Sequence, residues 1–567
     1  MLSCRPAVLV LLLLFSVGLS AQNFTKPIGL PDTLSGTNFN LTLAPSTFEF
    51  FDGVATQTYG ISRDYLAPTL IFNKEDRVQM NVTNNLPDTT TLHWHGMHVP
   101  PEDDGGPHTA ITPGGIWNPE FEVMDDATTF WYHPHLHGKT TDHVYRGCAG
   151  MIIIRDDEEA ALPLPRTYGV DDFPLIIQDK MFDASGQFIH TPFGDTMMVN
   201  GVVFPYIEVP AQRVRFRMLN ASVERAYMFG ISDNRTYDWI GSDGGLFPQK
   251  VTVPRTQLVA GERAELVVDF TGQAGQTVYL SSFSSELPMG LPGGPGGHGG
   301  GMMGHPPSPL DSADFHILQI RVVAANNNPS PQVPTTLVSH SPPQEVDATV
   351  FRTKVMTATA NDPNLFVFDS TIFNHHHIDD TVYLGSTEVW TLINNTFIAH
   401  SFHIHDIQFY VLDINGNPPP PFYLGKKDVI LLEPNDTIRF IGEFLDHADP
   451  HIPYMYHCHI LPHEDAGMMG QFVVLDTTPV SVYDQLPTNE QITLYPNPTS
   501  GQVQLQWDQP QAASVLLRIT DSNGRLYRQM QWQPGEELDL AFLSAGIYFV
   551  AIRSEEQWIV RKVVKQD

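Results

Sequence analysis

Basic residues are scarce in this chain, which has 31 lysines and arginines against 63 aspartates and glutamates and a formal charge of −32. Phosphate backbones bind to basic faces, so this balance argues against nucleic acid as a partner. Long apolar runs are missing beyond the N-terminal segment, which excludes a later helical membrane span. Cysteine is the third shortage, with three residues in 567.

The N-terminal segment predicts export. Arg5 precedes an apolar run from Ala7 to Phe15, and small residues follow up to Ala21. A basic start, a short apolar core and a small-residue end are typical of a secretory signal peptide, and the core is too short for a convincing membrane span. We therefore expect residues 1–21 to be a signal peptide and the mature protein to lack a membrane span.

Turn formers and strand-like runs predict an all-β fold. The chain has 46 prolines, 43 glycines and 10% aromatic residues, which suits short strands and turns better than helix bundles. Apolar runs recur at sandwich-like spacing, for example at 77–82, 213–219 and 264–270.

The most informative motif runs from His457 to Met468. Successive side chains of an extended strand point to opposite faces, so Cys458 points one way and its neighbours His457 and His459 point the other. A thiolate, a later imidazole at His463 and a thioether at Met468 form the soft ligand set of a type 1 copper. The flanking histidines then face a second metal site, which gives electrons a short covalent route.

Three further histidine clusters supply the other ligands that such a pair of sites requires. A lone His-x-His pair more often marks a zinc site or a surface pair, but four clusters in one chain favour a multi-copper protein. The type 1 set is His400, Cys458 and His463 with Met468 as weak axial ligand, and the three-copper set is His93, His95, His133, His135, His403, His405, His457 and His459.

These motifs resemble those of the multicopper oxidases, the family of laccases, bilirubin oxidases and the bacterial copper-efflux oxidase. The resemblance covers roughly residues 35–478. It implies four copper ions per chain, one-electron oxidation of a donor at type 1 copper and four-electron reduction of O2 to water. It also implies three cupredoxin-like Greek-key β-sandwich domains, which we expect at residues 35–160, 165–325 and 348–478.

The resemblance also assigns the histidines to individual coppers. The type 2 copper takes His93 and His403, one type 3 copper takes His95, His133 and His459, and the other takes His135, His405 and His457. His137 is then a spare, either a group behind the ligands or a solvated turn residue. With Cys458 on copper, Cys148 has no disulfide partner and is expected to pack as a small buried residue.

Two acids resemble carboxylates that serve proton delivery in the copper-efflux branch of the family. Asp104 follows the first motif and Glu464 directly follows His463. Reduction of O2 to water consumes protons, which carboxylates near the cluster can supply. The alternative for each residue is a solvated turn acid.

The C-terminal region has a different character. It opens with Tyr495-Pro-Asn-Pro and closes with Gly546-Ile-Tyr-Phe-Val, which resembles the sorting domain of type IX secretion. We therefore expect a small β-sandwich over residues 490–567 that engages the secretion machinery and directs the protein outside the cell or to its surface. The alternative is an appended module for carbohydrate or protein binding.

The sequence is compatible with two classes of electron donor. A phenol-like organic donor makes the protein laccase-like, and Cu(I) or Fe(II) makes it a metal-ion oxidase in copper tolerance. The Gly/Met/His segment 288–305 and the run His375–His377 favour a metal donor if they bind metal, whereas a disordered loop and a polar turn are the other readings. Thr396–Ala399 stands where the copper-efflux oxidase has the aspartate and methionine that bind its substrate copper. The absence of these two ligands weakens the metal-ion oxidase alternative.

Other classes fit less well. A copper nitrite reductase has a single histidine before its cysteine and a mononuclear second site, and a non-enzymatic scaffold would have lost ligands. A copper-sequestering protein needs no His-Cys-His bridge and stays a remote alternative. An axial thioether at Met468 favours easily oxidised donors, because it lowers the type 1 potential. The sequence does not specify the oligomeric state.

Overall fold

The computed structural model describes residues 24–295, 309–311, 313–326, 329–476, 492–507, 515–521, 526–533, 535–554 and 557–566. The predicted signal peptide over residues 1–21 lies outside these ranges. The chain divides into two compact units, residues 1–476 and 477–567.

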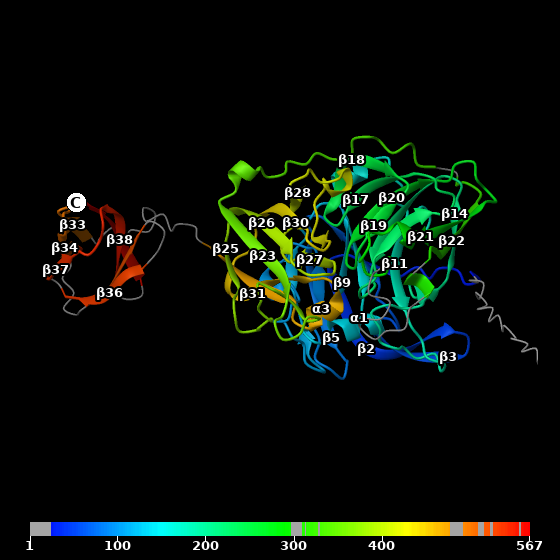
Figure 1. Ribbon diagram of the computed structural model, residues 1–567, viewed down its shortest axis with the longest axis horizontal. Helices are drawn as coiled ribbons and strands as arrows, with labels where there is room; N and C mark the ends of the chain where they lie inside the picture. Colours follow the sequence, from blue (N-terminus) through cyan, green and yellow to red (C-terminus); the bar gives the residue numbers. More distant parts are fainter. Residues whose placement is uncertain are drawn as a thin grey trace, which may run out of the picture. The chain divides into compact units, whose positions relative to one another are not determined.

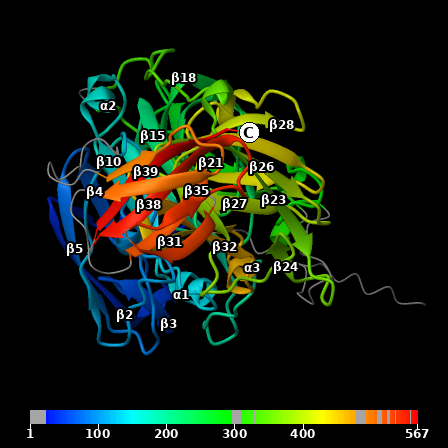
Figure 2. The ribbon, with the colours of Figure 1, turned by 90° about the vertical axis from the view of Figure 1, so that its left-hand side faces the viewer.

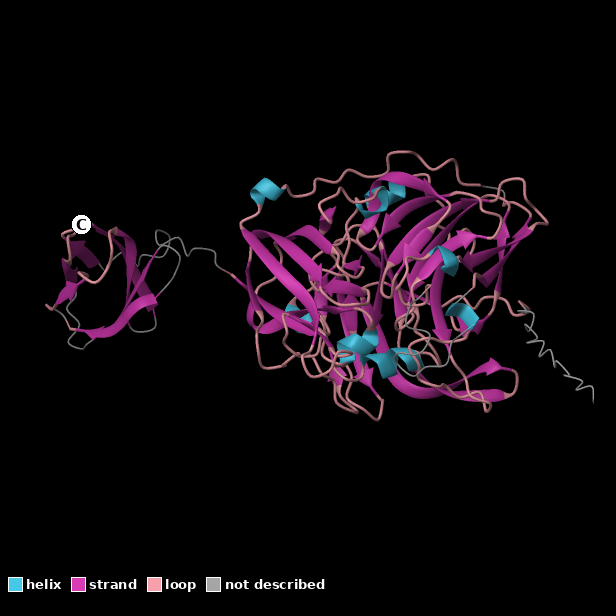
Figure 3. Ribbon diagram, in the orientation of Figure 1, coloured by secondary structure: helices cyan, strands magenta, loops and turns pink. Residues whose placement is uncertain are grey.

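The all-β prediction is confirmed (Figure 3). Within the described residues the α-helices are three short segments: α1 (Thr140–Arg146), α2 (Asp157–Ala161) and α3 (Leu461–Asp465). Single turns of 3-10 helix complete the helical structure: η1 (Pro101–Asp103), η2 (Ser284–Glu286), η3 (Pro309–Asp311), η4 (Glu345–Asp347) and η5 (Pro421–Tyr423). No helix in the described part of the chain is long and apolar enough to cross a membrane.

The first pair of sheets encloses a core that includes Leu41 and Val82 from one sheet and Leu70 and Phe130 from the other. One sheet has the order β1 (Thr33–Ser35), β4 (Thr69–Asn73), β10 (Gly150–Arg155), β9 (Thr129–His133), β6 (His93–His95). The other has the order β3 (Val54–Ile61), β2 (Asn38–Phe51), β5 (Arg77–Asn84), β7 (Ile116–Trp117), with β8 (Glu120–Glu122) also paired to β5.

The second pair of sheets encloses a core that includes Val214, Leu266, Phe229 and Ile320. The larger sheet has the order β13 (Val202–Val203), β12 (Thr196–Val199), β11 (Asp172–Lys180), β15 (Arg213–Asn220), β20 (Arg263–Asp269), β17 (Tyr237–Ser242), β18 (Gly245–Val253). The smaller has the order β14 (Tyr206–Pro210), β22 (Phe315–Val323), β21 (Thr277–Ser282), β16 (Tyr227–Ile231), β19 (Thr256–Leu258).

The third pair of sheets encloses a core that includes Trp390, Phe440, Phe402 and Phe472. One sheet has the order β24 (Phe366–Phe368), β23 (Val350–Ala358), β26 (Ser386–Asn394), β30 (Thr437–Phe444), β28 (Tyr410–Ile414). The other has the order β25 (Asp380–Tyr383), β32 (Met469–Leu475), β31 (Asp449–Cys458), β27 (His400–Ile404), β29 (Val429–Leu432).

Contacts between the three sandwiches make the first unit continuous. Leu287 and Leu291, which follow β21, pack with Ala399 and Leu431 of the third sandwich. Helices α1 and α3 lie side by side in two perpendicular views (Figures 1 and 2), and the N–H groups of Thr140 and Thr141 donate to the Asp465 carboxylate at 3.1 and 2.8 Å. These contacts bring residues near 140 against the helix that carries His463.

The second unit is a smaller pair of sheets around Val503, Leu538, Leu517 and Val550. One sheet has the order β33 (Ile492–Tyr495), β34 (Gln502–Trp507), β37 (Glu537–Asp539). The other has the order β36 (Leu526–Trp532), β35 (Val515–Asp521), β38 (Gly546–Ser554), β39 (Gln557–Lys565).

Candidate metal centre

Two antiparallel strand pairs bring the histidine motifs together. In the first sandwich β6 pairs with β9, with His93 opposite His133. In the third, β27 pairs with β31, with His403 opposite His457 and Phe402 opposite Cys458. The two-residue period of each strand then places alternate histidines on one face. All ten predicted histidine ligands are buried.

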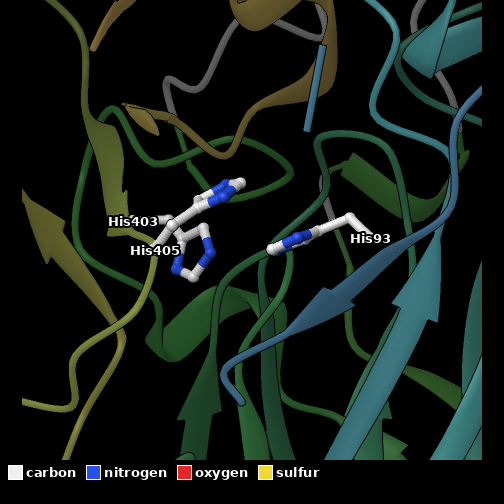
Figure 4. A group of neighbouring side chains, drawn as sticks. All are labelled: His93, His403 and His405. Atoms are coloured by element: carbon white, nitrogen blue, oxygen red, sulfur yellow. The ribbon is translucent and has the colours of Figure 1, made fainter. Parts of the chain in front are cut away.

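The eight histidines of the predicted three-copper set lie in one buried cluster between the first and third sandwiches, and the space between their ring nitrogens is called the cavity. Their ring nitrogens form three groups whose members lie within 4.8 Å of one another: His93, His403 and His405; His95, His133 and His459; His135, His405 and His457. Figure 4 shows the rings of His403 and His405 facing that of His93. The last two groups have the membership that the resemblance implies, and His405 also joins the predicted type 2 pair.

Four of these eight rings turn lone pairs inward, because backbone carbonyl groups accept from the opposite nitrogen. A carbonyl oxygen can only accept, so Nδ1 carries the proton and Nε2 is left as an acceptor. The Nδ1–carbonyl pairs are His93–Asp104 at 2.9 Å, His403–Asp428 at 2.8 Å, His133–Pro134 at 2.8 Å and His457–Cys458 at 3.1 Å.

Converging acceptors with no donor between them indicate a cation site. The Nε2 atoms of His93 and His403 are buried without a hydrogen-bond partner, as are both ring nitrogens of His459. The Nε2 atoms of His135 and His457 lie 2.9 Å apart. Burial lowers the pKa of His135, His457 and His459, with further lowering by neighbouring histidines, so the rings are neutral and suited to metal binding. The donor set therefore fits copper.

Two buried carboxylates face ring nitrogens of the cavity. Asp104 Oδ2 accepts from His405 Nδ1 at 2.8 Å, and Glu464 lies 3.5 Å from His135 Nδ1 and 3.3 Å from His457 Nδ1. Burial opposes ionisation of Asp104, but His405 and His93 hold the pKa of this carboxyl well below its usual range. Burial raises the pKa of Glu464 well above its usual range, and the negative charge of Asp465 adds to the effect. Neither acid is a solvated turn residue.

His95 has the opposite orientation because a carboxylate faces its Nε2 atom. Asp428 Oδ1 lies 3.3 Å from His95 Nε2, which leaves Nδ1 of His95 to face His133 Nε2 at 3.4 Å. Arg263 in turn donates to Asp428 Oδ1 at 2.7 Å and to the Thr129 carbonyl oxygen at 3.1 Å. Asp428 and Arg263 were not predicted from the sequence, because neither belongs to a histidine motif.

The predicted type 1 residues form a separate buried group. The Sγ atom of Cys458 lies 3.6 Å from His400 Nδ1 and 3.7 Å from His463 Nδ1. Thr396 Oγ1 lies 2.9 Å from His400 Nε2, so the opposite ring nitrogen faces the thiol. Burial raises the pKa of the Cys458 thiol to about 12, so a thiolate forms here only when a cation compensates its charge.

Met468 lies next to this group. Its side chain is buried in the same core as Cys458. Its backbone carbonyl oxygen accepts from the Cys458 N–H at 3.1 Å, and its own N–H donates to the His463 carbonyl oxygen at 2.9 Å.

The remaining sequence candidates lie outside the two groups. His137 is exposed, with its ring against Phe373. Residues 288–295 of the Gly/Met/His segment are described, with Met289 exposed, whereas residues 296–305 lie outside the described ranges. Cys148 is buried in the first core without a disulfide, as expected.

Similarity to known proteins decides the family. Residues 42–159 and 338–478 match the family described as multicopper oxidase, and residues 493–566 match the secretion system C-terminal sorting domain. Multicopper oxidase mco of Staphylococcus haemolyticus is 33% identical over 450 residues, 77% of this chain and 88% of that protein. The chain belongs to the multicopper oxidase family. It is therefore an oxidoreductase of a copper-dependent family with a C-terminal secretion signal.

Two other relatives extend the comparison. A bacterial laccase-like multi-copper oxidase, CueO from Ochrobactrum sp., has a TM-score of 0.71 at 31% identity, covering 79% of this chain and all of that one; oxidase activity towards lignin model compounds and lignosulfonate is described for it. Cell division protein FtsP of Xenorhabdus nematophila is 31% identical over 463 residues, 80% of this chain and 93% of that protein. These likenesses confirm the cupredoxin-like fold.

Replacing Asp428 with Asn should weaken copper binding at the cavity. The change removes the charge that holds His95 and takes one of two carboxylates from the buried Arg263 guanidinium, since Asp243 lies 3.6 Å from it. Partners of this kind are typically worth about 10- to 100-fold in metal affinity. Copper content per chain and the blue absorbance check this. We expect copper loss with the blue colour kept, whereas Asp413→Asn, at a partly exposed pair with Arg439, should change neither. Full copper content in Asp428→Asn under chelator challenge contradicts the assignment.

Proposed function

We propose that this protein couples the oxidation of a small reducing substrate to the reduction of O2 to water with four copper ions. His400, Cys458, His463 and axial Met468 hold the type 1 copper. The eight cavity histidines hold the three-copper cluster with the type 2 and type 3 assignments given above. When bound, the coppers supply one-electron oxidation of the donor and four-electron reduction of O2.

The single observation that carries the proposal is the position of Cys458 between the two candidate sites. Its thiol lies with His400 and His463, while the adjacent rings of His457 and His459 lie in the histidine cavity. One residue of covalent backbone therefore joins the two groups. Neither a scaffold protein nor a copper store has a use for such a bridge.

We place the entry point for electrons from the reducing substrate at His463. His463 as a residue is 6% exposed, whereas each of the other predicted ligands is at most 1% exposed. The ligand nearest to solvent gives a donor in solution its shortest path to the thiolate group. Thr396 bonds His400 and occupies the segment that would carry acidic and thioether ligands for a substrate copper ion.

We infer a phenol-like organic donor. The absence of an aspartate and a methionine at 396–399 and the likeness to the laccase-like Ochrobactrum protein support it. Cu(I) or Fe(II) is the second candidate, favoured by the exposed run His375–His377. A non-catalytic copper-binding role is the third.

Oxygen uptake by the copper-loaded chain tests the function. We expect uptake with a methoxyphenol as sole donor and at most slow uptake with Cu(I). The Cys458→Ser variant, which keeps the eight cavity histidines, should lose the blue colour and donor-dependent uptake. Fast uptake with Cu(I) alone would make the protein a metal-ion oxidase. No uptake with either donor by fully loaded, blue protein would contradict both enzymatic candidates.

We further propose that Asp104 and Glu464 deliver protons for O2 reduction. Each carboxylate touches cavity histidines and neither has a cation nearby to neutralise it permanently among the described residues. They lie on different elements, one after β6 and one on α3, and each faces a histidine of the group formed by His135, His405 and His457.

Amide variants test the proton-delivery proposal. Asp104→Asn and Glu464→Gln should slow O2-dependent turnover by about 10²- to 10⁴-fold, the usual contribution of a positioned acid or base. Blue colour and anaerobic bleaching by the donor should stay unchanged, because these report the type 1 site, and turnover is compared at equal copper content per chain. Asp413→Asn, at a partly exposed pair with Arg439, is the control, because it contacts neither the cavity histidines nor the two acids. Unchanged turnover in both variants would end the proposal.

Met468 is proposed as the axial ligand. In Met468→Leu the thioether is lost and the type 1 reduction potential should rise, because a coordinating thioether stabilises the oxidised copper relative to an alkyl group. Redox titration of the blue band measures this. The neighbouring Met469→Leu, buried on the opposite face of β32, should leave the potential unchanged. A potential that is unchanged or lower in Met468→Leu would exclude axial ligation.

We also propose that the sorting domain sends the protein through type IX secretion to the exterior or the cell surface. The match of residues 493–566 to a secretion sorting domain supports this over a carbohydrate-binding module.

A further inference from the structure

A second group of imidazoles lies on the surface of the first unit, apart from the copper ligands. It combines His108, from the loop after η1, with His375 and His376, from the loop between β24 and β25. The ring centroids of His108 and His375 are 3.9 Å apart, and those of His375 and His376 are 5.4 Å apart. Residues distant in sequence therefore meet here, and we call these three the outer histidine group.

A buried glutamine joins the two loops. The side-chain N–H₂ of Gln471 donates to the carbonyl oxygens of His377 at 2.6 Å and His375 at 3.2 Å. Because these acceptors fix the amide nitrogen, the amide oxygen is the atom that faces His108. It lies 2.7 Å from His108 Nε2, which must therefore carry the proton. Gln471 is fully buried and is hydrogen-bonded to both loops.

This arrangement leaves His108 with a free acceptor. With Nε2 donating to Gln471, the lone pair of neutral His108 is on Nδ1. Burial lowers the pKa of His108, and the neighbouring His375 and His376 lower it further, so the ring is neutral at pH 7. His375 and His376 are exposed and their rings have no hydrogen bond in the described part of the chain.

Solvent reaches the group from the side of His108. The imidazole lines an open pocket of about 260 Å³ formed with Ile111, Thr112 and Trp117. A hydrated ion can approach there, and the large negative charge of the chain raises the local concentration of cations.

We propose that the outer histidine group binds one divalent transition-metal ion of the zinc and copper class, with His108 and His375 as ligands and His376 closing the site. Neutral imidazoles are preferred ligands of these ions, and water fills the remaining positions. The buried rings of the copper cavity converge as they stand, whereas exposed His375 and His376 turn towards the ion when it binds. The site does not depend on the copper assignments proposed above.

The site lies beside the type 1 group. The N–H of Phe373, two residues before His375, donates to the Gly467 carbonyl oxygen at 3.1 Å, and Gly467 directly precedes Met468. An ion bound here therefore sits on the loop that adjoins the proposed axial ligand.

Zinc binding to the copper-loaded, tag-free full chain tests the proposal. Calorimetry with Zn(II) should show one site per chain, and metal analysis should show that the copper content is unchanged. His108→Ala and His375→Ala should each weaken the site by at least about tenfold. His451→Ala, an exposed histidine at the start of β31, should bind as the parent does. No site in the parent, or equal affinity in all variants, overturns the proposal.

Chemical protection provides a second readout that needs no variant. Diethylpyrocarbonate modifies accessible neutral histidines, and mass spectrometry locates the adducts. Zn(II) should protect His108 and His375 while His451 reacts at the same rate. Equal reaction of His108 and His375 with and without Zn(II) overturns the proposal, even where calorimetry detects zinc elsewhere.

Discussion

The buried ion pair between Arg263 and Asp428 connects all three sandwiches at the metal cavity. Arg263 lies on β20 of the second sandwich and Asp428 directly precedes β29 of the third, while the bonded His95 belongs to β6 of the first. Two charges buried in this way are costly to desolvate, and only good geometry and further hydrogen bonds offset that cost. Arg263 meets the requirement with added bonds to the Thr129 and Asp243 carbonyl oxygens. The second sandwich contributes no predicted copper ligand, yet it fixes the orientation of one.

The histidine motifs and the all-β fold could be predicted because both follow from local chemistry. Strand alternation alone separates Cys458 from His457 and His459, and the structure places them in different groups as expected. Asp428 and Arg263 could not be predicted in the same way. Their contacts with His95 join residues far apart in the chain, and no local pattern marks a carboxylate that will face a ring from another sheet. The membership of His405 in two groups likewise depends on how two sandwiches meet.

Charge explains why so many imidazoles can share one cavity. Protonated rings at these separations would repel one another, and burial keeps the rings neutral. Asp104, Asp428 and Glu464 contribute acidic groups at the edges of the cavity, where each faces a ring nitrogen directed away from its centre. A set of neutral rings with carboxylates behind them is the arrangement that favours bound cations, since the acids compensate metal charge without competing for the inner positions.

The loop from Asp104 to His108 connects the cavity with the surface over a very short distance along the chain. Gly105 has φ +82°, and a Cβ there would lie 1.9 Å from the Leu92 carbonyl oxygen, so no larger residue fits against β6. Asp104 consequently faces His405, while His108 reaches Gln471 and the outer histidine group. A metal ion held at His108 would restrain the same loop that carries the proposed proton donor. The turn that brings an acid to the cavity therefore also determines where the proposed outer site can form.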